Sequence, residues 1–243
     1  MSTPPLFFLD SVPLVDVVLL TGDEGRHAGQ VMRVRPGDAL WLSDGRGALL
    51  ECTVKQTRSD GVVLRVGTRT EVPVQLPQLT VVQALPKGDR GELAVAVMTE
   101  LGVDAIVPWA ASRCVTQWVG PRGAKALDKW RRTAREAAKQ SRRARVPLCA
   151  PLMSTREVAS MLGGESMLVL HESAPEPLAT CPLPQTEEIV LVVGPEGGVA
   201  DEELAMFVGS GARAVRLGAP VMRTSTAGAA ALAALSVRLG RWN

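Results

Sequence analysis

The sequence is poor in histidine and cysteine, the residues of metal sites and disulfides, and has no long apolar run. It has two histidines among 243 residues, and its four cysteines stand far apart with no CxxC pair: Cys52, Cys114, Cys149 and Cys181. This spacing argues against a structural zinc site, and we expect no metal. The longest apolar stretch, residues 227–235, is far shorter than the roughly 20 residues of a membrane span. The first 20 residues have no basic n-region, so we expect no signal peptide and a cytoplasmic protein with free, mostly buried cysteines.

The net charge of the chain is also small, but its charged residues are unevenly distributed. The formal net charge of the chain is +2. Residues 113–145 hold eleven Lys or Arg and two acids, a local net charge of +9, so the remainder carries −7. Such asymmetry predicts a basic face for a polyanion such as RNA.

The chain changes its pattern near residue 70. Residues 16–69 consist of short β-rich runs separated by turn sequences, which predicts a small antiparallel barrel or sandwich, interrupted at 22–34 by a segment that could hold a short helix. A polar stretch with two prolines follows at 68–78. We place the domain boundary there, between domains of residues 1–72 and 73–243.

The second part has the pattern of an α/β fold. Residues 89–101 have helical spacing, and continuous apolar runs occur at 79–85, 105–108, 167–170, 189–193 and 214–217. Continuous apolar runs are typical of strands buried on both faces of a parallel sheet. Helical segments between several of these runs predict a mainly parallel sheet.

One predicted helix, residues 125–144, carries a modest apolar stripe and an excess of basic residues. Because helices normally mix both signs of charge, we interpret it as a helix that contacts RNA or DNA phosphates, with a solvated surface helix as the alternative. Trp109, Trp118 and Trp130 lie near this basic region. They could stack on bases or pack in a core or dimer interface.

Two loops follow consecutive predicted strands, where open α/β sheets bind ligands. The first, 194–198, has the sequence GPEGG, whose glycines permit close approach of a ligand and whose Glu196 suits a cation better than a phosphate. The second, 217–227, contains Arg223 and leads into an Ala-rich helix. A plain strand-to-helix turn and an exposed loop arginine are the alternatives for these two features.

Together these loops resemble the RsmE family, the bacterial 16S rRNA uridine-N3 methyltransferases of the SPOUT superfamily. The resemblance extends over nearly the whole chain. It includes 27–38 (HAGQVMRVRPGD), Asp44-Gly45, 99–108 (TELGVDAIVP), Arg113 and 136–147 (EAAKQSRRARVP).

The resemblance implies an N-terminal PUA-like antiparallel β-barrel that helps to bind rRNA and a C-terminal SPOUT methyltransferase domain. That domain is mainly parallel α/β, dimerises, and contains a trefoil knot, an exception to the rule that chains do not thread loops. S-adenosylmethionine (SAM) is the implied cofactor, and the substrate is the uridine at position 1498 of 16S rRNA in the small ribosomal subunit. The implied cofactor-binding residues are Leu170, His171, Gly194, Pro195, Glu196, Gly197, Gly198, Leu217, Gly218, Met222, Arg223 and Thr224.

For catalysis the candidates are Arg223 and Glu196. Uridine N3 is protonated at neutral pH, so the site must remove the proton or stabilise the developing anion, and Arg223 is the candidate for the second task. Glu196 is the candidate carboxylate near the sulfonium. The RNA-binding candidates are Arg26, His27, Arg33, Arg113, Lys129, Arg132, Lys139, Gln140 and Arg143.

Some positions differ from the family pattern. Ser225 stands where the family often has Glu after Arg-Thr, and Ala200 replaces a usual Ser, which removes an N-cap side chain. His171 follows a strand but is more often, as a lone histidine, a structural residue than a proton carrier. Two rival functions remain open at this point: a SPOUT ribose 2′-O-methyltransferase and a non-catalytic rRNA-binding assembly factor.

Overall fold

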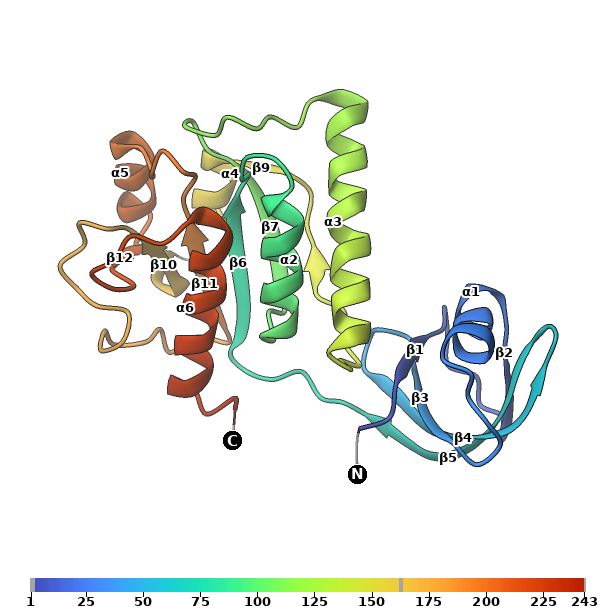
Figure 1. Ribbon diagram of the computed structural model, residues 1–243. Coiled ribbons are helices and arrows are strands. Elements are labelled where there is room, and N and C mark those ends of the chain that lie inside the picture. The colour runs from blue at the N-terminus through green and yellow to red at the C-terminus, as the bar shows by residue number, and fades with distance from the viewer. Residues whose placement is uncertain (1–2, 162–163, 243) are drawn as a thin grey trace. The chain divides into compact units, whose positions relative to one another are not determined.

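The chain divides into two compact units in the computed structural model, which describes residues 3–161 and 164–242 (Figure 1). The first unit combines Met1–Val74 with Ala138–Val146. The second combines Gln75–Ala137 with Pro147–Asn243.

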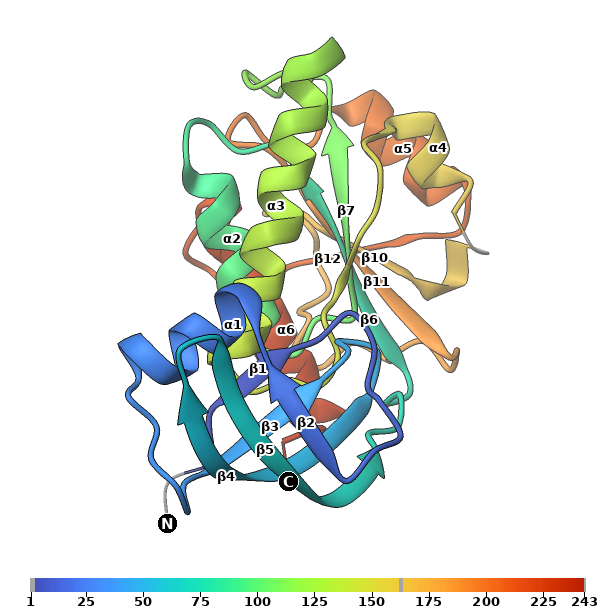
Figure 2. The same ribbon diagram turned by 90° about the vertical axis from the view of Figure 1, so that its right-hand side faces the viewer.

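The first unit is built on a five-stranded sheet in the order β1-β3-β4-β5-β2 (Figure 2). Its strands are β1 (Leu6–Phe8), β2 (Val17–Leu20), β3 (Ala39–Ser43), β4 (Ala48–Arg58) and β5 (Gly61–Glu71). Three of the pairings are antiparallel, as expected, whereas β1 pairs with β3 in parallel. Two register shifts between β4 and β5 act as bulges, which bend long strands. The segment that interrupts the strand pattern forms α1 (Gly22–Arg26) and the π-helix η1 (His27–Val31).

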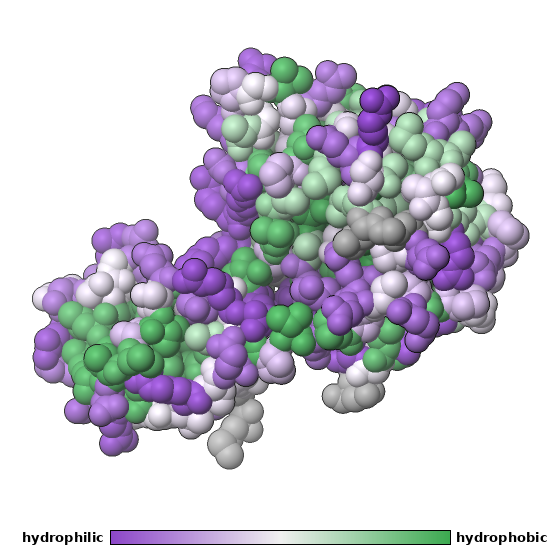
Figure 3. Space-filling view, turned by 180° about the vertical axis from the view of Figure 1, so that it is seen from behind, coloured by the Kyte–Doolittle hydropathy of each residue, from purple (hydrophilic) through white to green (hydrophobic). Residues whose placement is uncertain are grey.

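The core of this unit is formed by strands in which buried and exposed side chains alternate. In β2, Val18 and Leu20 are buried while Val17 and Leu19 are exposed, because successive side chains point to opposite faces. Figure 3 shows hydrophobic side chains on the surface of this unit, at the lower left. The strand β2 therefore presents apolar side chains both to the core and to solvent.

The segment 138–146 belongs to this unit because its side chains and backbone contact the strands. Ala138 is fully buried in a cluster with Leu6 and Phe8. The Ser43 hydroxyl donates to the Ala144 carbonyl at 3.0 Å, and the Gly47 N–H donates to the same carbonyl at 3.1 Å. The last residues of the helix α3 (Gly120–Gln140), from Ala138 onward, thus belong to the first unit.

The second unit contains a sheet in the order β12-β10-β11-β6-β7-β8, in which every pairing is parallel. This confirms the parallel sheet predicted from the continuous apolar runs. Figure 2 shows α2 and α6 on one face of the sheet and α4 and α5 on the other. The strands are β6 (Gln78–Ala84), β7 (Ala105–Ala110), β8 (Leu148–Cys149), β9 (Met153–Ser154), β10 (Met167–Leu170), β11 (Glu188–Val193) and β12 (Arg213–Val215). The helices are α2 (Arg90–Glu100), α3 (Gly120–Gln140), α4 (Thr155–Ala159), the 3₁₀ helix η2 (Gly164–Ser166), α5 (Asp201–Gly209) and α6 (Thr224–Arg238).

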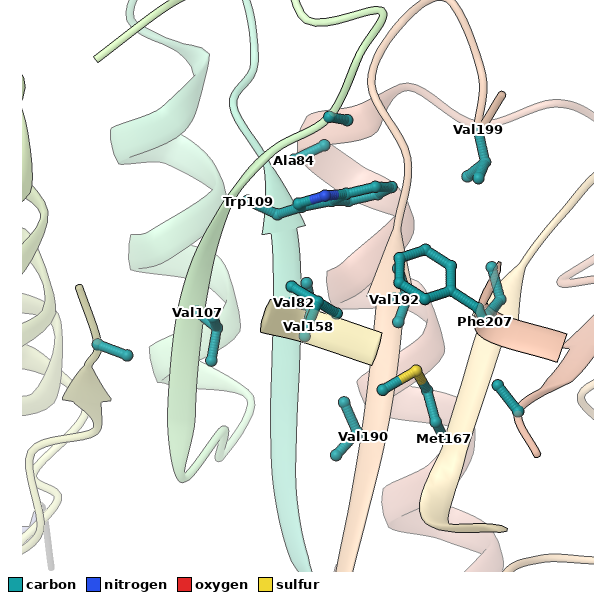
Figure 4. Packing of buried hydrophobic residues seen from close by; sticks show 14 residues of the cluster. Val82, Ala84, Val107, Trp109, Val158, Met167, Val190, Val192, Val199 and Phe207 are labelled. Atoms are coloured by element: carbon teal, nitrogen blue, oxygen red, sulfur yellow. The ribbon is translucent and has the colours of Figure 1, made fainter. Parts of the chain in front are cut away.

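The core on one face of this sheet is a mainly aliphatic cluster that includes two aromatic rings (Figure 4). Trp109 is fully buried and meets Phe207 edge to face, with ring centroids 5.3 Å apart. Trp130 is also buried and packs on the half-buried Trp118. Burial of Trp109 and Trp130 decides between the two roles considered for them, since buried indoles pack in the core and do not stack on bases.

The four cysteines are free thiols, and three of them are buried, as expected. Burial raises the pKa of Cys52 and of Cys149 to about 11, so both stay protonated at neutral pH and serve as small apolar groups. Over the described part of the chain, every helix is too short or too polar to cross a membrane.

Candidate functional site

Three loops of the second unit meet at one edge of the sheet and enclose a cavity of about 510 Å³. They follow β10, β11 and β12, which are neighbours in the sheet, and the carboxyl ends of parallel strands lie at the same edge. The cavity is lined by all of the residues that the resemblance assigns to the cofactor: Leu170, His171, Gly194, Pro195, Glu196, Gly197, Gly198, Leu217, Gly218, Met222, Arg223 and Thr224. The structure thus brings together residues that are far apart in the sequence.

The glycine-rich loop 194–198 needs glycine for its own folding at two positions. A methyl group on Gly194 would lie 2.7 Å from Val199 Cγ2, closer than real carbon atoms approach. Gly198 has φ +73, a left-handed conformation that other residues rarely adopt. These requirements keep the loop tight as the chain passes from β11 to α5.

Gly218 differs from both, because the protein itself leaves room for a side chain there. A methyl group on Gly218 would meet only Pro220 Cδ, at 3.8 Å, and the backbone has no positive φ. Gly218 also lines the cavity. The absence of a side chain at this position therefore leaves space for a ligand.

The cavity wall carries charges of both signs. Two carboxylates, Glu172 and Glu196, and two guanidinium groups, Arg216 and Arg223, line it. The Glu196 carboxylate accepts a hydrogen bond from the Lys87 N–H at 3.1 Å, so the loop after β6 also supports this wall. Glu172 and Arg216 were not among the predicted site residues, although their places close to the ends of the predicted strands 167–170 and 214–217 were an available signal.

Arg223 is exposed at the N-cap of α6. Behind it, Thr224 is buried, and its carbonyl accepts a hydrogen bond from the Gln83 side-chain amide at 3.3 Å. This buried hydrogen bond fixes the backbone at the start of α6, from which the exposed Arg223 side chain extends. Helix N-termini also stabilise negative charge, so this end of α6 is suited to an anion.

His171 is held as a structural residue. Its backbone N–H donates to the Val215 carbonyl at 3.0 Å, and its Nδ1 accepts from the Ser173 N–H at 3.3 Å. These contacts join the loop after β10 to β12.

Arg113, one of the RNA-binding candidates, lies against the glycine-rich loop. Its Nη1 donates to the Gly197 carbonyl at 3.1 Å. The side chain therefore supports the loop that lines the cavity, a contact that the sequence alone did not indicate.

The basic candidates on α3 have different surroundings. Lys129 is exposed and pairs with Glu92 at 3.0 Å, and Arg132 is exposed. Lys139, however, is 11% exposed, pairs with Glu24, and lies 5.2 Å from the centre of the Phe7 ring. This ammonium is therefore paired with a carboxylate and largely covered inside the first unit, and its contact with an RNA phosphate stays a prediction.

The remaining RNA-binding candidates lie in the first unit. Arg26 is exposed and pairs with Asp23, and the His27 ring meets Phe7 edge to face at 6.0 Å. Arg33 is exposed with φ +53, just after η1. Gln140 is exposed and Arg143 half-buried in the segment that packs on this unit.

The chemistry of the cavity suits a cofactor-sized ligand with both positive and negative groups. Its volume lies within the range of about 300–1,000 Å³ typical of small-molecule sites. Carboxylates can bind a cationic group, guanidinium groups a carboxylate, and the loop backbones can bind polar edges. The described residues contain no group of three side chains that would hold a metal ion.

Comparison with known proteins agrees with this site. The RNA methyltransferase domain family matches residues 74–236, and the RNA methyltransferase PUA domain family matches residues 20–67. The chain is 47% identical to Ribosomal RNA small subunit methyltransferase E of Mycobacterium bovis, over 98% of this chain and 93% of the relative.

Solved structures share the whole fold. Ribosomal RNA small subunit methyltransferase E of Neisseria gonorrhoeae, bound to S-adenosyl methionine, is 30% identical with a TM-score of 0.86, covering 97% of this chain and 98% of that one. A Legionella pneumophila protein in complex with the cofactor SAM is 26% identical with a TM-score of 0.85, covering 98% of each chain. The matches span both units. The chain therefore belongs to the family of ribosomal RNA small subunit methyltransferase E.

Proposed function

We propose that this protein is a SAM-dependent methyltransferase that methylates N3 of a uridine in 16S rRNA of the small ribosomal subunit. One observation carries the proposal: three separate loops, each following one of three neighbouring strands, meet around a single cavity of cofactor size. Relatives with the same fold bind SAM. The uridine that the resemblance implies, at position 1498, is the proposed substrate.

The residues of the cavity fit SAM. Bound SAM supplies a methyl group on a positively charged sulfonium. Glu172 and Glu196 place negative charge in the cavity, and Gly218 leaves the wall open to a close approach. The loop backbones at 170–171, 194–198 and 217–224 would hold the remainder of the cofactor.

Arg223 acts on the uridine in this proposal. As N3 loses its proton, negative charge spreads to the uracil oxygens O2 and O4, and a guanidinium that is already in place stabilises it. The N-terminus of α6 adds a favourable dipole at the same point. Residue 225 is a buried serine, so this position supplies no carboxylate that could take the N3 proton.

We further propose how the parts of the chain divide the work. Residues 1–72 form the RNA-binding domain and residues 73–243 the catalytic domain, which is knotted and forms a homodimer. The matched ranges of the two domain families support this division. The site of action is the cytoplasm, because the substrate is the ribosomal small subunit.

The exposed basic residues of α3 are proposed to contact rRNA phosphates. Replacing Lys125, Lys129 and Arg132 together by alanine is expected to weaken RNA binding and to lower its salt dependence. Each contact to a single strand contributes about 0.7 to the slope of log K against log salt, so the slope should fall by about 2. The binding constant measured over a series of salt concentrations gives this slope.

A charge-preserving variant is the control for that measurement. Lys125→Arg, Lys129→Arg and Arg132→Lys together keep all three charges and should keep the slope of the unmodified protein. If the alanine variant had the same slope as this control, α3 would not contact the RNA.

The product nucleoside tests the proposed reaction. The protein is incubated with isolated small subunits and methyl-labelled SAM, and the rRNA is digested to nucleosides for mass spectrometry. N3-methyluridine is the expected product. A label on ribose 2′-oxygen would show a 2′-O-methyltransferase, and a folded protein that binds RNA but not SAM would be a non-catalytic assembly factor.

A further inference from the structure

Glu203 is a buried carboxylate to which the proposed reaction assigns no task. It lies in the first turn of α5 and is 6% exposed. Its Oε1 accepts hydrogen bonds from the Ser112 N–H at 2.8 Å and from the Thr155 hydroxyl at 2.9 Å, and its Oε2 accepts from the Ala200 N–H at 3.2 Å. A buried carboxylate is stable when several hydrogen-bond donors surround it. Removing this carboxylate would leave the three donors without an acceptor.

The donors come from three different segments of the second unit. Ser112 follows β7, Thr155 begins α4, and Ala200 immediately precedes α5. Thr155 in turn accepts from the indole N–H of Trp109 at 3.1 Å. Figure 4 shows Trp109 and Val199 near the same end of the strands. Glu203 is thus the centre of a polar network that joins the loop after β7 to the starts of two helices.

This network also holds the glycine-rich loop. The loop 194–198 is followed by Val199 and then by Ala200, whose N–H is bound to Glu203. Arg113, the neighbour of Ser112, donates to the Gly197 carbonyl at 3.1 Å. Two adjacent residues after β7 therefore support the loop: Arg113 binds the Gly197 carbonyl, and Ser112 acts through Glu203 at the beginning of α5.

The sequence explains why a carboxylate is needed here. Ala200 is the N-cap of α5 and has no side-chain oxygen to accept a hydrogen bond from the first turn. Glu203 supplies the reciprocal half of a capping box by accepting from the Ala200 N–H. An amide in its place would present an NH₂ group to at least one of the three donors.

We infer that Glu203 is a positioning residue that sets the shape of the glycine-rich loop and thereby the affinity for the methyl donor. It acts through Ser112, Thr155 and Ala200, and does not line the cavity itself. This inference rests on the proposed function, because the ligand whose affinity it sets is SAM.

The test is Glu203→Gln, which keeps the size of the side chain. If the amide oxygen takes the place of Oε1, the NH₂ group faces the Ala200 N–H and the link to α5 is lost. Because hydrogen bonds to a charged group are strong, the Kd for SAM measured by calorimetry should rise about tenfold. RNA affinity, which depends on other surfaces, should stay within about twofold.

Val95→Ala is the matched control for a general loss of stability. Val95 is fully buried in α2 and takes part in none of the hydrogen bonds of the network. The control should lower the Tm, as a large-to-small core substitution does, but leave the Kd for SAM unchanged. Arg113→Ala should raise that Kd, like Glu203→Gln.

A second measurement, amide hydrogen exchange of the free protein, does not depend on SAM. Exchange at residues 196–200 should become about fivefold faster in Glu203→Gln and stay unchanged in Val95→Ala. The inference is wrong if Glu203→Gln binds SAM as tightly as the unmodified protein, or if exchange in the loop does not change. An unmodified protein that fails to bind SAM would refute the proposed function, and the exchange result would then decide the positioning role by itself.

Discussion

Replacing Arg223 by alanine is expected to lower the rate of methyl transfer about a hundredfold, which is the usual loss when one donor to a developing anion is removed. Arg223 is exposed at the start of α6 and lines the cavity, so its loss should not affect folding. Affinity for rRNA should change less than about threefold, because many phosphate contacts contribute to binding. Single-turnover methylation of small subunits measures the rate directly.

Arg156→Ala is the control for that variant, because it removes an exposed arginine of α4 that does not line the cavity. Its rate should equal that of the unmodified protein. If Arg223→Ala methylated rRNA at the rate of the unmodified protein, Arg223 would have no role in the reaction.

Adding a methyl group at Gly218 is expected to weaken SAM binding about tenfold, with no change in Tm. The methyl group would meet only Pro220 Cδ at 3.8 Å, so the free protein accepts it, but it would occupy space at the cavity wall. Overfilling a packed site costs about 1–3 kcal/mol, and 1.4 kcal/mol corresponds to a factor of ten. Calorimetry with SAM and a thermal melt of Gly218→Ala provide the two values.

Gly194→Ala provides the contrast. Its methyl group would lie 2.7 Å from Val199 Cγ2, so this variant should lose stability as well as SAM affinity. If Gly218→Ala bound SAM with the affinity of the unmodified protein, the wall around Gly218 would not contact the cofactor.

The cavity could be predicted from the sequence because it depends on local patterns. Continuous apolar runs indicate buried parallel strands, and parallel strands end at a common edge. The loops that follow residues 170, 193 and 215 had to meet there. Glu172 and Arg216 were overlooked because charged residues in loops are common and carry no pattern of their own.

The polar network around Glu203 could not be predicted in the same way. Ser112 and Thr155 are 91 and 48 residues away from Glu203 in the chain. Hydrogen bonds between distant segments leave no periodic signal, so the sequence indicated only that Ala200 provides no N-cap side chain.

Lys139 and the end of α3 show a second limit. The helical pattern identifies which residues share a face, but not what that face contacts. Ala138 is buried against Leu6 and Phe8, and Lys139 pairs with Glu24 in the first unit. The pattern of a basic helix predicts an RNA contact for Lys139 but gives no sign of its carboxylate partner Glu24.

The decisive experiment is a crystal structure of the protein with SAM. We expect the donor inside the cavity between 170–172, 194–198 and 217–224, with its sulfonium on the side of the Glu172 and Glu196 carboxylates and its methyl group open toward Arg223. A donor bound elsewhere, with this cavity filled by water alone, would contradict this expectation.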